Sequence, residues 1–434
     1  MSIFSFTQKP GRFSITLAVQ LAASAGLVSL TLVATAQPAS PPPSPTPSPP
    51  PSLKQALDAA WQLSGTSRAE HNRRIELTAK TKAANSWISG EPVAAISHRT
   101  DRLNRNDGFR EYEAEVELAL WNPGVRAAAL ADVSAQQLGI DGQLALAKLK
   151  LAGELRALAA SAATAQVELD LNKRKLLDVN LLAQDLNRRV KVGENARVDG
   201  LLAQVQVQLA QTAVALAESQ LTRLQNQWRS LTGLATVAPL DAVPSNLSPI
   251  EAQNPTFSPD HPALRFAQAQ LASAQAKLTL AVADKRDPMS VGIGASRERG
   301  SFAAANETKL RIALRVPLGG DNRNAPRQAA ARAELDTAQA EVDAVARQLP
   351  FEIAAAGADL RAARAAQFAT SERVRLSTEV QTLIAKSWQL GDSDLPARLR
   401  ADNEQFEASL ALAKANIDVQ RAIAHLNQAQ GVLP

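Results

Sequence analysis

The segment "VGENARVDGLLAQ" at residues 192–204 decides the fold, because a looser version of it, "LGDSDLPARLRAD", recurs at residues 390–402. Gly193 and Gly391 lie 198 positions apart, and a second pair of glycines, each 40 residues farther along, keeps the same interval. A glycine at such a point favours a left-handed turn that ends a helix and reverses the chain. One turn and one helix length therefore occur twice, half a molecule apart.

The earlier part of each half also repeats. Pro92 matches Pro288 at an interval of 196 residues. In both halves the pattern predicts a helix, two short strands, a very long helix, a glycine turn and a second long helix. We therefore expect a first structural repeat at residues 52–232 and a second at residues 258–434. The linker between them, residues 233–257, contains prolines that prevent a continuing helix.

The N-terminal region has the pattern of an exported protein. Lys9 and Arg12 precede an apolar stretch that closes with Ala-Thr-Ala, which predicts a cleaved signal peptide at residues 1–36. Residues 37–51 are rich in proline and predict a stiff spacer of polyproline type. No later segment approaches the roughly 18 consecutive apolar residues of a membrane-spanning helix.

Composition excludes several classes of function. Aromatic residues make up only 4% of the chain, which is typical of long helices rather than of one thick core. The net charge of +5 is spread among interspersed acids and bases, which argues against a nucleic-acid partner. The chain has no cysteine, and its 4 histidines do not pair at metal-ligand spacing. Because no nucleophile triad, phosphate loop or dinucleotide fingerprint occurs either, we expect no enzyme, no cofactor and no metal site.

The helical segments are unusually long. Between Pro123 and Pro239 the sequence contains no proline. A helix over residues 124–191 would be roughly 100 Å long at 1.5 Å per residue. Such a length exceeds a compact domain, so the helices must pack as hairpins or coiled coils. Pro350 is predicted to bend the second long helix.

Four short segments have the alternation of strands. In "YEAEVELAL", three glutamates occupy one face and apolar residues the other, and "KLRIALRV" opposes basic residues to apolar ones in the same way. Alternation of this kind fits a soluble sheet with one face on a core, or a membrane β-barrel that is apolar outside and charged inside. Export, and the lack of any segment free to cover four apolar faces, favour the barrel. The predicted strands are at about 92–99, 111–121, 289–298 and 307–317.

Four strands cannot close a barrel, because an open edge in lipid leaves backbone groups unpaired. The smallest spanning barrels have about eight strands. Two chains would supply eight strands and a filled lumen, whereas three chains would supply twelve and could leave a channel. We expect charged side chains to line the lumen. The lumen candidates are Glu113, Glu115, Glu117, Lys309, Arg311 and Arg315.

The duplicated order of elements resembles the TolC-like outer-membrane efflux proteins, the exit ducts of tripartite pumps in Gram-negative bacteria. The resemblance covers roughly residues 52–434. It rests on the turn "VG-x5-D-x-LLAQ" at 192–204, on "HPAL" at 261–264, and on the corners "LWNPGVR" at 120–126 and "PLGGDNR" at 317–323. The first corner and the small size are most similar to the subgroup that serves heavy-metal cation pumps.

This resemblance implies a mainly α-helical fold with a membrane β portion. The expected assembly is a homotrimer whose twelve-stranded barrel in the outer membrane continues as an α-helical barrel in the periplasm. Family members are passive ducts that open at their periplasmic helix tips when an adaptor protein and an inner-membrane pump engage them. Acidic residues near the tips ring the closed pore, but here the second repeat has Ala397 and Arg400 where acids are expected. The tip and gate candidates are Gly193, Asp199, Gly391, Asp392 and Asp394.

Two other classes of function remain open from the sequence. A soluble periplasmic coiled-coil adaptor or scaffold would share the long hairpins, although it would not need four alternating strands. A protein that binds the membrane surface or the cell wall would fit the basic balance and the proline-rich spacer. The sequence names neither the exported substrate nor the partner pump.

Overall fold

The computed structural model describes residues 51–240, 259–319 and 321–434, with the side chains of residues 321–323 left out. The expected signal peptide, almost all of the spacer and most of the linker between the repeats lie outside the described residues. All that follows concerns the unit that spans residues 49–434.

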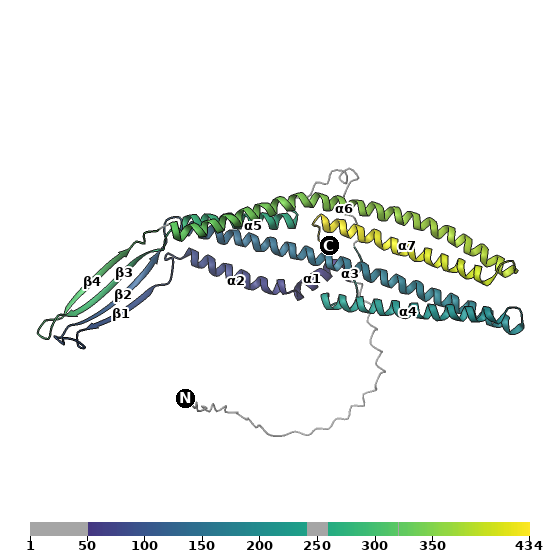
Figure 1. The fold of residues 1–434 in the computed structure, drawn as a ribbon, viewed down its shortest axis with the longest axis horizontal. Coiled ribbons are helices and arrows are strands. Elements are labelled where there is room, and N and C mark those ends of the chain that lie inside the picture. The colour runs from purple at the N-terminus through teal and green to yellow at the C-terminus, as the bar shows by residue number, and fades with distance from the viewer. Residues whose placement is uncertain (1–50, 241–258, 320) are drawn as a thin grey trace, which may run out of the picture. The chain divides into compact units, whose positions relative to one another are not determined.

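The described residues form long helices and one small sheet (Figure 1). The helices are α1 (Leu53–Leu63), α2 (Gly65–Asn85), α3 (Val125–Val192), α4 (Arg197–Thr232), α5 (Pro262–Ala283), α6 (Asp321–Leu390) and α7 (Leu395–Ala429). The strands are β1 (Val93–Thr100), β2 (Arg110–Leu120), β3 (Met289–Arg299) and β4 (Glu307–Arg315). Each half thus contributes one strand hairpin and one hairpin of long helices. Before the strands of the first half, two helices stand where one was predicted, because Ser64 ends α1 and caps α2.

The two strand hairpins join into a single antiparallel sheet with the order β1-β2-β3-β4. The seam between the repeats is the β2–β3 ladder, in which Val116 faces Ile293 and Tyr112 faces Arg297. Among the described residues, the outer strands β1 and β4 each pair on one side only. Side chains on neighbouring strands therefore share faces across both repeats.

The helices pack mainly through α3 and α6. Helix α3 packs against α4, α5 and α7, and α6 packs against α5 and α7. The best enclosed contact joins α1, α3 and α4, where Leu155 and Trp228 are fully buried beside Leu57. Many other buried positions of α3 are alanines, which let the helix axes approach closely.

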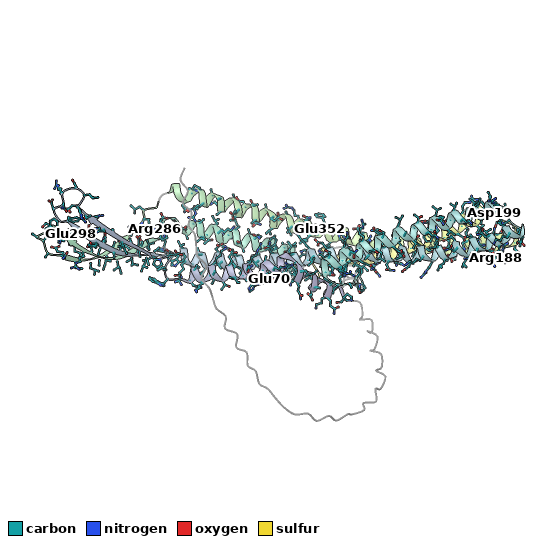
Figure 2. All side chains as sticks on the ribbon, turned by 90° about the horizontal axis from the view of Figure 1, so that it is seen from below. Glu70, Arg188, Asp199, Arg286, Glu298 and Glu352 are labelled. Carbon is teal, nitrogen blue, oxygen red and sulfur yellow. The ribbon has the colours of Figure 1, made fainter. Side chains whose placement is uncertain are left out.

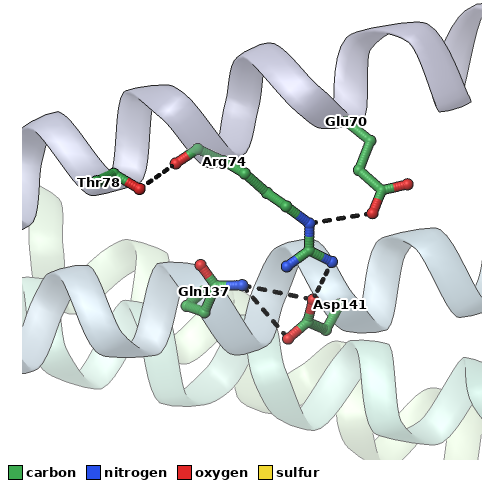
Figure 3. A network of polar contacts seen from close by, with 5 residues as sticks. All are labelled: Glu70, Arg74, Thr78, Gln137 and Asp141. Atoms are coloured by element: carbon green, nitrogen blue, oxygen red, sulfur yellow. Dashed lines mark hydrogen bonds and ion pairs between the residues drawn. The ribbon is translucent and has the colours of Figure 1, made fainter.

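Helix α2 lies along α3 and is held there by polar contacts at the surface (Figure 3). The Arg74 guanidinium contacts Asp141 of α3 and Glu70 of its own helix, both at 3.0 Å. Gln137 also donates to Asp141, and the Thr78 hydroxyl donates to the Arg74 carbonyl. Because these groups are exposed, water screens both ion pairs, and only the one to Asp141 joins α2 to α3.

Glycines end the four longest helices at matching places. Gly193 and Gly391 follow α3 and α6 with φ of 87° and 84°, and Gly233 and Gly431 lie after α4 and α7 with φ of 75° and 77°. A side chain resists this left-handed conformation, so glycine is favoured at each place. The equal angles show that the duplication seen in the sequence is a duplication of backbone geometry.

Prolines lie at the start of α5 and inside α6. His261 caps α5, since its Nδ1 accepts a hydrogen bond from the Ala263 amide at 3.2 Å, as its position before Pro262 predicts. Helix α6 continues through Pro350 over 70 residues, and Figure 1 shows it curving along its length. Leu349 and Ile353, on either side of Pro350, are buried, and Ile353 packs against α7.

Candidate functional site

One face of the sheet carries the predicted charged residues, and they pair across strands. Arg311 of β4 contacts Glu113 of β2 at 2.9 Å, and Arg315 contacts Glu117 at 2.8 Å. Each pair joins the first repeat to the second across the intervening strand β3. Acidic side chains of β2 and basic side chains of β4 therefore neutralise one another in part.

The intervening strand is built to allow these contacts. Where β3 crosses under the glutamates it carries Gly292 and Gly294. A Cβ at Gly294 would lie 3.2 Å from the Glu115 Cβ and 3.0 Å from the Ala114 carbonyl oxygen, and a Cβ at Gly292 would collide with the Glu115 carboxylate. The glycines thus leave room for β2 glutamates to lie over β3. The sequence shows that glycines occupy these positions, but it does not show that glutamate side chains of β2 lie over them.

Not every charge on this face is balanced. Lys309 contacts both Glu298 at 2.7 Å and Glu307 at 3.6 Å, so one cation serves two carboxylates. Within the described residues, Glu115 has no cationic partner. The charged face therefore retains a net negative charge.

The opposite face of the sheet is apolar and uncovered. The side chains of Ile96, Leu310 and Ile312 are 87%, 76% and 73% exposed, although each is a large hydrophobe. Soluble proteins rarely leave a contiguous apolar surface of this kind open to water. In the part of the chain that the structure describes, both edge strands also leave backbone groups unpaired, which favours pairing with further strands.

The first helix tip positions Asp199 in the opening turn of α4. Its carboxylate accepts a hydrogen bond from the Asn195 side-chain amide at 3.2 Å, and it is half-buried. The N-cap residue is Ala196, which makes no side-chain capping bond. Figure 2 labels Asp199 near this tip and Glu298 on β3, at the other end of the long helices.

At the second tip, Asp392 and Asp394 make different contacts from those of Asp199. Asp394 is the N-cap of α7, and its Oδ1 accepts from the Ala397 amide at 2.8 Å. Asp392 is exposed, and its backbone amide bonds the Ser387 carbonyl oxygen as part of the turn. Sequence reasoning grouped both as gate charges and missed the cap, although an Asp one residue before the start of a helix is a recognisable N-cap signal.

Behind the tips lies a cluster that the sequence did not single out. Trp388 of α6 is 9% exposed and packs with Leu186 of α3 and Leu395 of α7. Two guanidiniums stack on its ring, Arg189 at 4.8 Å and Arg398 at 4.6 Å from the centroid. Cation–π contacts of this kind fix the two helical hairpins against each other at their ends.

A polar groove between α3 and α7 continues from this cluster along the hairpins. Burial lowers the pKa of Lys175, whose ammonium lies over the Phe406 ring at 4.2 Å. Burial, and the nearby Asp402 carboxylate, raise the pKa of Asp178. Among the described residues no group of three or more potential metal ligands gathers, here or elsewhere.

Helix α4 is long and apolar enough, by length and composition, to cross a membrane. It instead forms a hairpin with α3, and only 28% of its most apolar stretch is buried within the chain. Its exposed apolar residues include Leu201, Val205 and Leu209. This side of the helical hairpin is open to a further partner.

Two known proteins are similar to this chain in sequence. No family model matches the chain. Protein CyaE of Bordetella pertussis is 27% identical over 317 residues, which is 70% of this chain and 67% of CyaE. The nickel-cobalt-cadmium resistance protein NccC of Alcaligenes xylosoxydans xylosoxydans is 32% identical over 173 residues, 38% of this chain and 39% of NccC.

Solved structures match over most of the chain. The outer membrane protein VceC of Vibrio cholerae superposes with a TM-score of 0.68 at 15% identity, over 88% of this chain and 96% of VceC. CusC, described as forming a transmembrane channel, superposes with a TM-score of 0.70 at 14% identity, over 88% of this chain and 92% of CusC. The resemblance predicted from the sequence is therefore confirmed: this chain has the fold of the TolC-like outer-membrane efflux proteins.

Proposed function

We propose that this chain is one subunit of a passive exit duct for an efflux pump in the outer membrane of a Gram-negative bacterium. The observation that carries this function is the sheet, which has one uncovered apolar face, one charged face and two open edges. In lipid such a sheet is stable only as part of a closed barrel with its apolar face outward. A soluble adaptor or scaffold would expose the same apolar face to water, so this alternative is disfavoured.

The duct is a homotrimer in this proposal. Three copies of the four-stranded sheet give twelve strands, which is enough for an open lumen, whereas two copies give a filled barrel. The long helices continue the channel into the periplasm as an α-helical barrel. The exposed apolar residues of α4 then meet helices of the neighbouring subunit, which accounts for their lack of partners within one chain.

The proposed lumen is lined by the charged face of the sheet, and therefore by Glu113, Glu115, Glu117, Lys309, Arg311 and Arg315. Because the face keeps uncompensated carboxylates, chiefly Glu115, the lumen favours cations over anions. Similarity to a nickel, cobalt and cadmium resistance protein makes metal cations a reasonable cargo. No resident cofactor or metal is needed for passive passage.

The proposed gate is formed by the helix tips around Gly193, Asp199, Gly391, Asp392 and Asp394. A periplasmic adaptor protein docks there and, together with an inner-membrane pump, spreads the tips. Support comes from the position of both turns at the far ends of the long helices and from the acidic groups beside them. In this arrangement Asp199 and Asp392 supply the pore charge, because Asp394 is occupied in capping α7.

The first experiment is fractionation of the expressed full-length protein, followed by light scattering of the detergent extract. A trimer that sediments with outer membranes and needs detergent supports the duct. A monomer or dimer in the soluble periplasmic fraction overturns it and restores the adaptor.

A second experiment tests the lumen in planar bilayers. Glu115→Lys should assemble normally and shift ion preference toward anions, whereas Ala114→Ser on the opposite face should leave ion preference unchanged. Loss of the trimer in Glu115→Lys would contradict the assignment of Glu115 to a wet lumen, as would an equal shift in Ala114→Ser.

A further inference from the structure

The apolar face of the sheet carries charge at one end only. Its members come from alternate positions of the four strands, as the register shows. In this set the acidic residues are absent, and the basic ones gather beside the two strand loops, away from the helices. The face consists of Ala94, Ile96, His98 and Thr100 of β1; Arg110, Tyr112, Ala114, Val116, Leu118 and Leu120 of β2; Met289, Val291, Ile293, Ala295, Arg297 and Arg299 of β3; and Thr308, Leu310, Ile312 and Leu314 of β4.

Two of the three arginines face each other directly. Arg110 of β2 and Arg299 of β3 are register partners, and Arg297 is the partner of Tyr112 one step farther along the same face. Like charges in directly opposed positions destabilise a sheet unless something neutralises them. Within the described residues none of the three forms an ion pair. This end of the face therefore carries a net positive charge that an anion would neutralise.

The three arginines are positioned to bind an anion. The Arg299 guanidinium donates to the Gly108 carbonyl oxygen at 3.3 Å and stacks on the Phe302 ring at 5.5 Å, which fixes its position. Arg110 and Arg297 are exposed. Next to them the His98 and Tyr112 rings stack with centroids 4.4 Å apart, which gives this end an amphipathic aromatic pair.

The apolar part of this face extends toward the height of the membrane's apolar band. From Ala114 to Leu120, β2 presents only apolar side chains on this face, over six residue steps or about 20 Å along the strand. A strand tilt of about 40° shortens this to about 15 Å, and the Tyr112 ring extends it toward the roughly 25 Å apolar band of outer-membrane barrels. Arg110, Arg297 and Arg299 begin where the apolar residues end, at the level of lipid headgroups. Because the helices lie at the opposite end of the strands, these headgroups belong to the outer leaflet.

We infer that Arg110, Arg297 and Arg299 form a binding site on the outward surface of the barrel for the phosphate groups of an outer-leaflet glycolipid of the lipid A class. The site rests on the proposed outer-membrane function. Guanidiniums bind phosphate oxygens in paired hydrogen bonds, and the adjacent apolar strand face accepts the acyl chains of the same molecule. One ligand thus satisfies both the unpaired cations and the uncovered hydrophobes.

The opposite face provides a matched control. Arg99 lies at the same height as these arginines but on the charged face, where it pairs with Glu111 at 3.6 Å. It is exposed as Arg110 and Arg297 are, so its replacement removes an exposed positive charge at the same end of the strands. A site on the outward face therefore depends on Arg110 and Arg297 and not on Arg99.

The test uses the full-length protein purified from outer membranes in a zwitterionic detergent. Diphosphoryl lipid A is titrated into it, and bound lipid is counted by native mass spectrometry. Arg110→Gln/Arg297→Gln should bind about 30-fold more weakly than wild type, because each arginine near an anionic surface contributes roughly a fivefold factor. Arg99→Gln should bind as wild type does, and Arg110→Lys/Arg297→Lys should keep most of the affinity.

Phosphate-free lipid A is the second probe. It should bind wild type as weakly as diphosphoryl lipid A binds the double glutamine variant. The comparison of the two lipids on wild-type protein tests the inference even if the double glutamine variant fails to assemble. Equal binding of both lipids to wild type overturns the inference, as does an equal loss in Arg99→Gln. A wild-type protein that never reaches the outer membrane is a different result, because it removes the proposed function itself.

Discussion

The two helix tips share a backbone but differ in how they stabilise it. Gly193 and Gly391 adopt nearly the same left-handed φ, 87° and 84°, and each is followed within a few residues by a new helix. At the first tip Ala196 leaves α4 without a side-chain cap, whereas at the second Asp394 caps α7. The two halves thus share the turn glycine, because few other residues adopt its backbone conformation readily. They differ in the neighbouring side chains, which the turn does not restrict.

The difference is largest behind the turns. Trp388 lies in the second repeat, and the residue 198 positions earlier is Val190. Only the tryptophan belongs to the buried cluster in which all four long helices meet. The second repeat therefore supplies most of the packing at the tips, while the first supplies the half-buried acid Asp199.

Trp388→Ala should have the largest effect on stability. Truncation of a buried tryptophan costs about 3–5 kcal/mol, because it leaves a cavity and removes the ring on which two arginines stack. Val190→Ala should cost less than about 1.5 kcal/mol. Thermal unfolding in detergent measures both. Equal losses would show that the two tips are packed alike, contrary to the structure.

Alanine at either turn glycine should have the next largest effect, and an equal one. At Gly193 and at Gly391 a new Cβ would meet no heavy atom within 4 Å, so only the positive φ opposes it. That conformation costs an L-residue about 1–2 kcal/mol. Gly139→Ala, within α3 and equally free of contacts, should instead stabilise the protein by about 0.5–1 kcal/mol. Unequal losses at the two turns would contradict the equivalence of their backbones.

Replacement of the tip aspartates should affect stability differently at the two tips. Asp394→Ala should lower the free energy of unfolding by about 1 kcal/mol, because it leaves the Ala397 amide without its acceptor. Asp199→Ala loses an interaction with the helix dipole and a side-chain hydrogen bond from Asn195, but no cap, and should cost about 0.5 kcal/mol. Asp394→Asn keeps the cap and loses the charge. A change of ion preference in Asp394→Asn would return Asp394 to the gate.

The smallest expected effect depends on pH. The raised pKa of Asp178 means that the folded protein holds this proton more tightly than the unfolded chain. Stability from this group is therefore complete below about pH 3.9, the unfolded pKa, and is lost as pH rises through the folded pKa. Asp178→Asn should then be slightly more stable than wild type at neutral pH and no more stable at about pH 3. Leu376, the counterpart of Asp178 in the second repeat, is neutral and carries no such dependence.

These differences show what a sequence reveals about a duplicated protein. The turn glycines, the strand segments and the charged alternation of β2 are local, so the sequence predicts them within a residue or two. Asp394 as a cap was also readable, but its grouping with the gate acids obscured it. Trp388 gave no signal, since its partners lie on three other helices and are distant in sequence.

The sequence by itself determined the repeat, the element order, the two chemically opposite faces of the strands and the resemblance to outer-membrane efflux proteins. Periodicity and turn chemistry are properties of neighbouring residues, which is why they can be read along the chain. Only the tertiary structure decided that β2 pairs with β3, that Arg311 reaches Glu113 over glycine, and that Arg110 faces Arg299. Strand register and helix packing bring together residues that are nearly 200 positions apart in the chain. A local sequence pattern does not specify which of these distant residues come into contact.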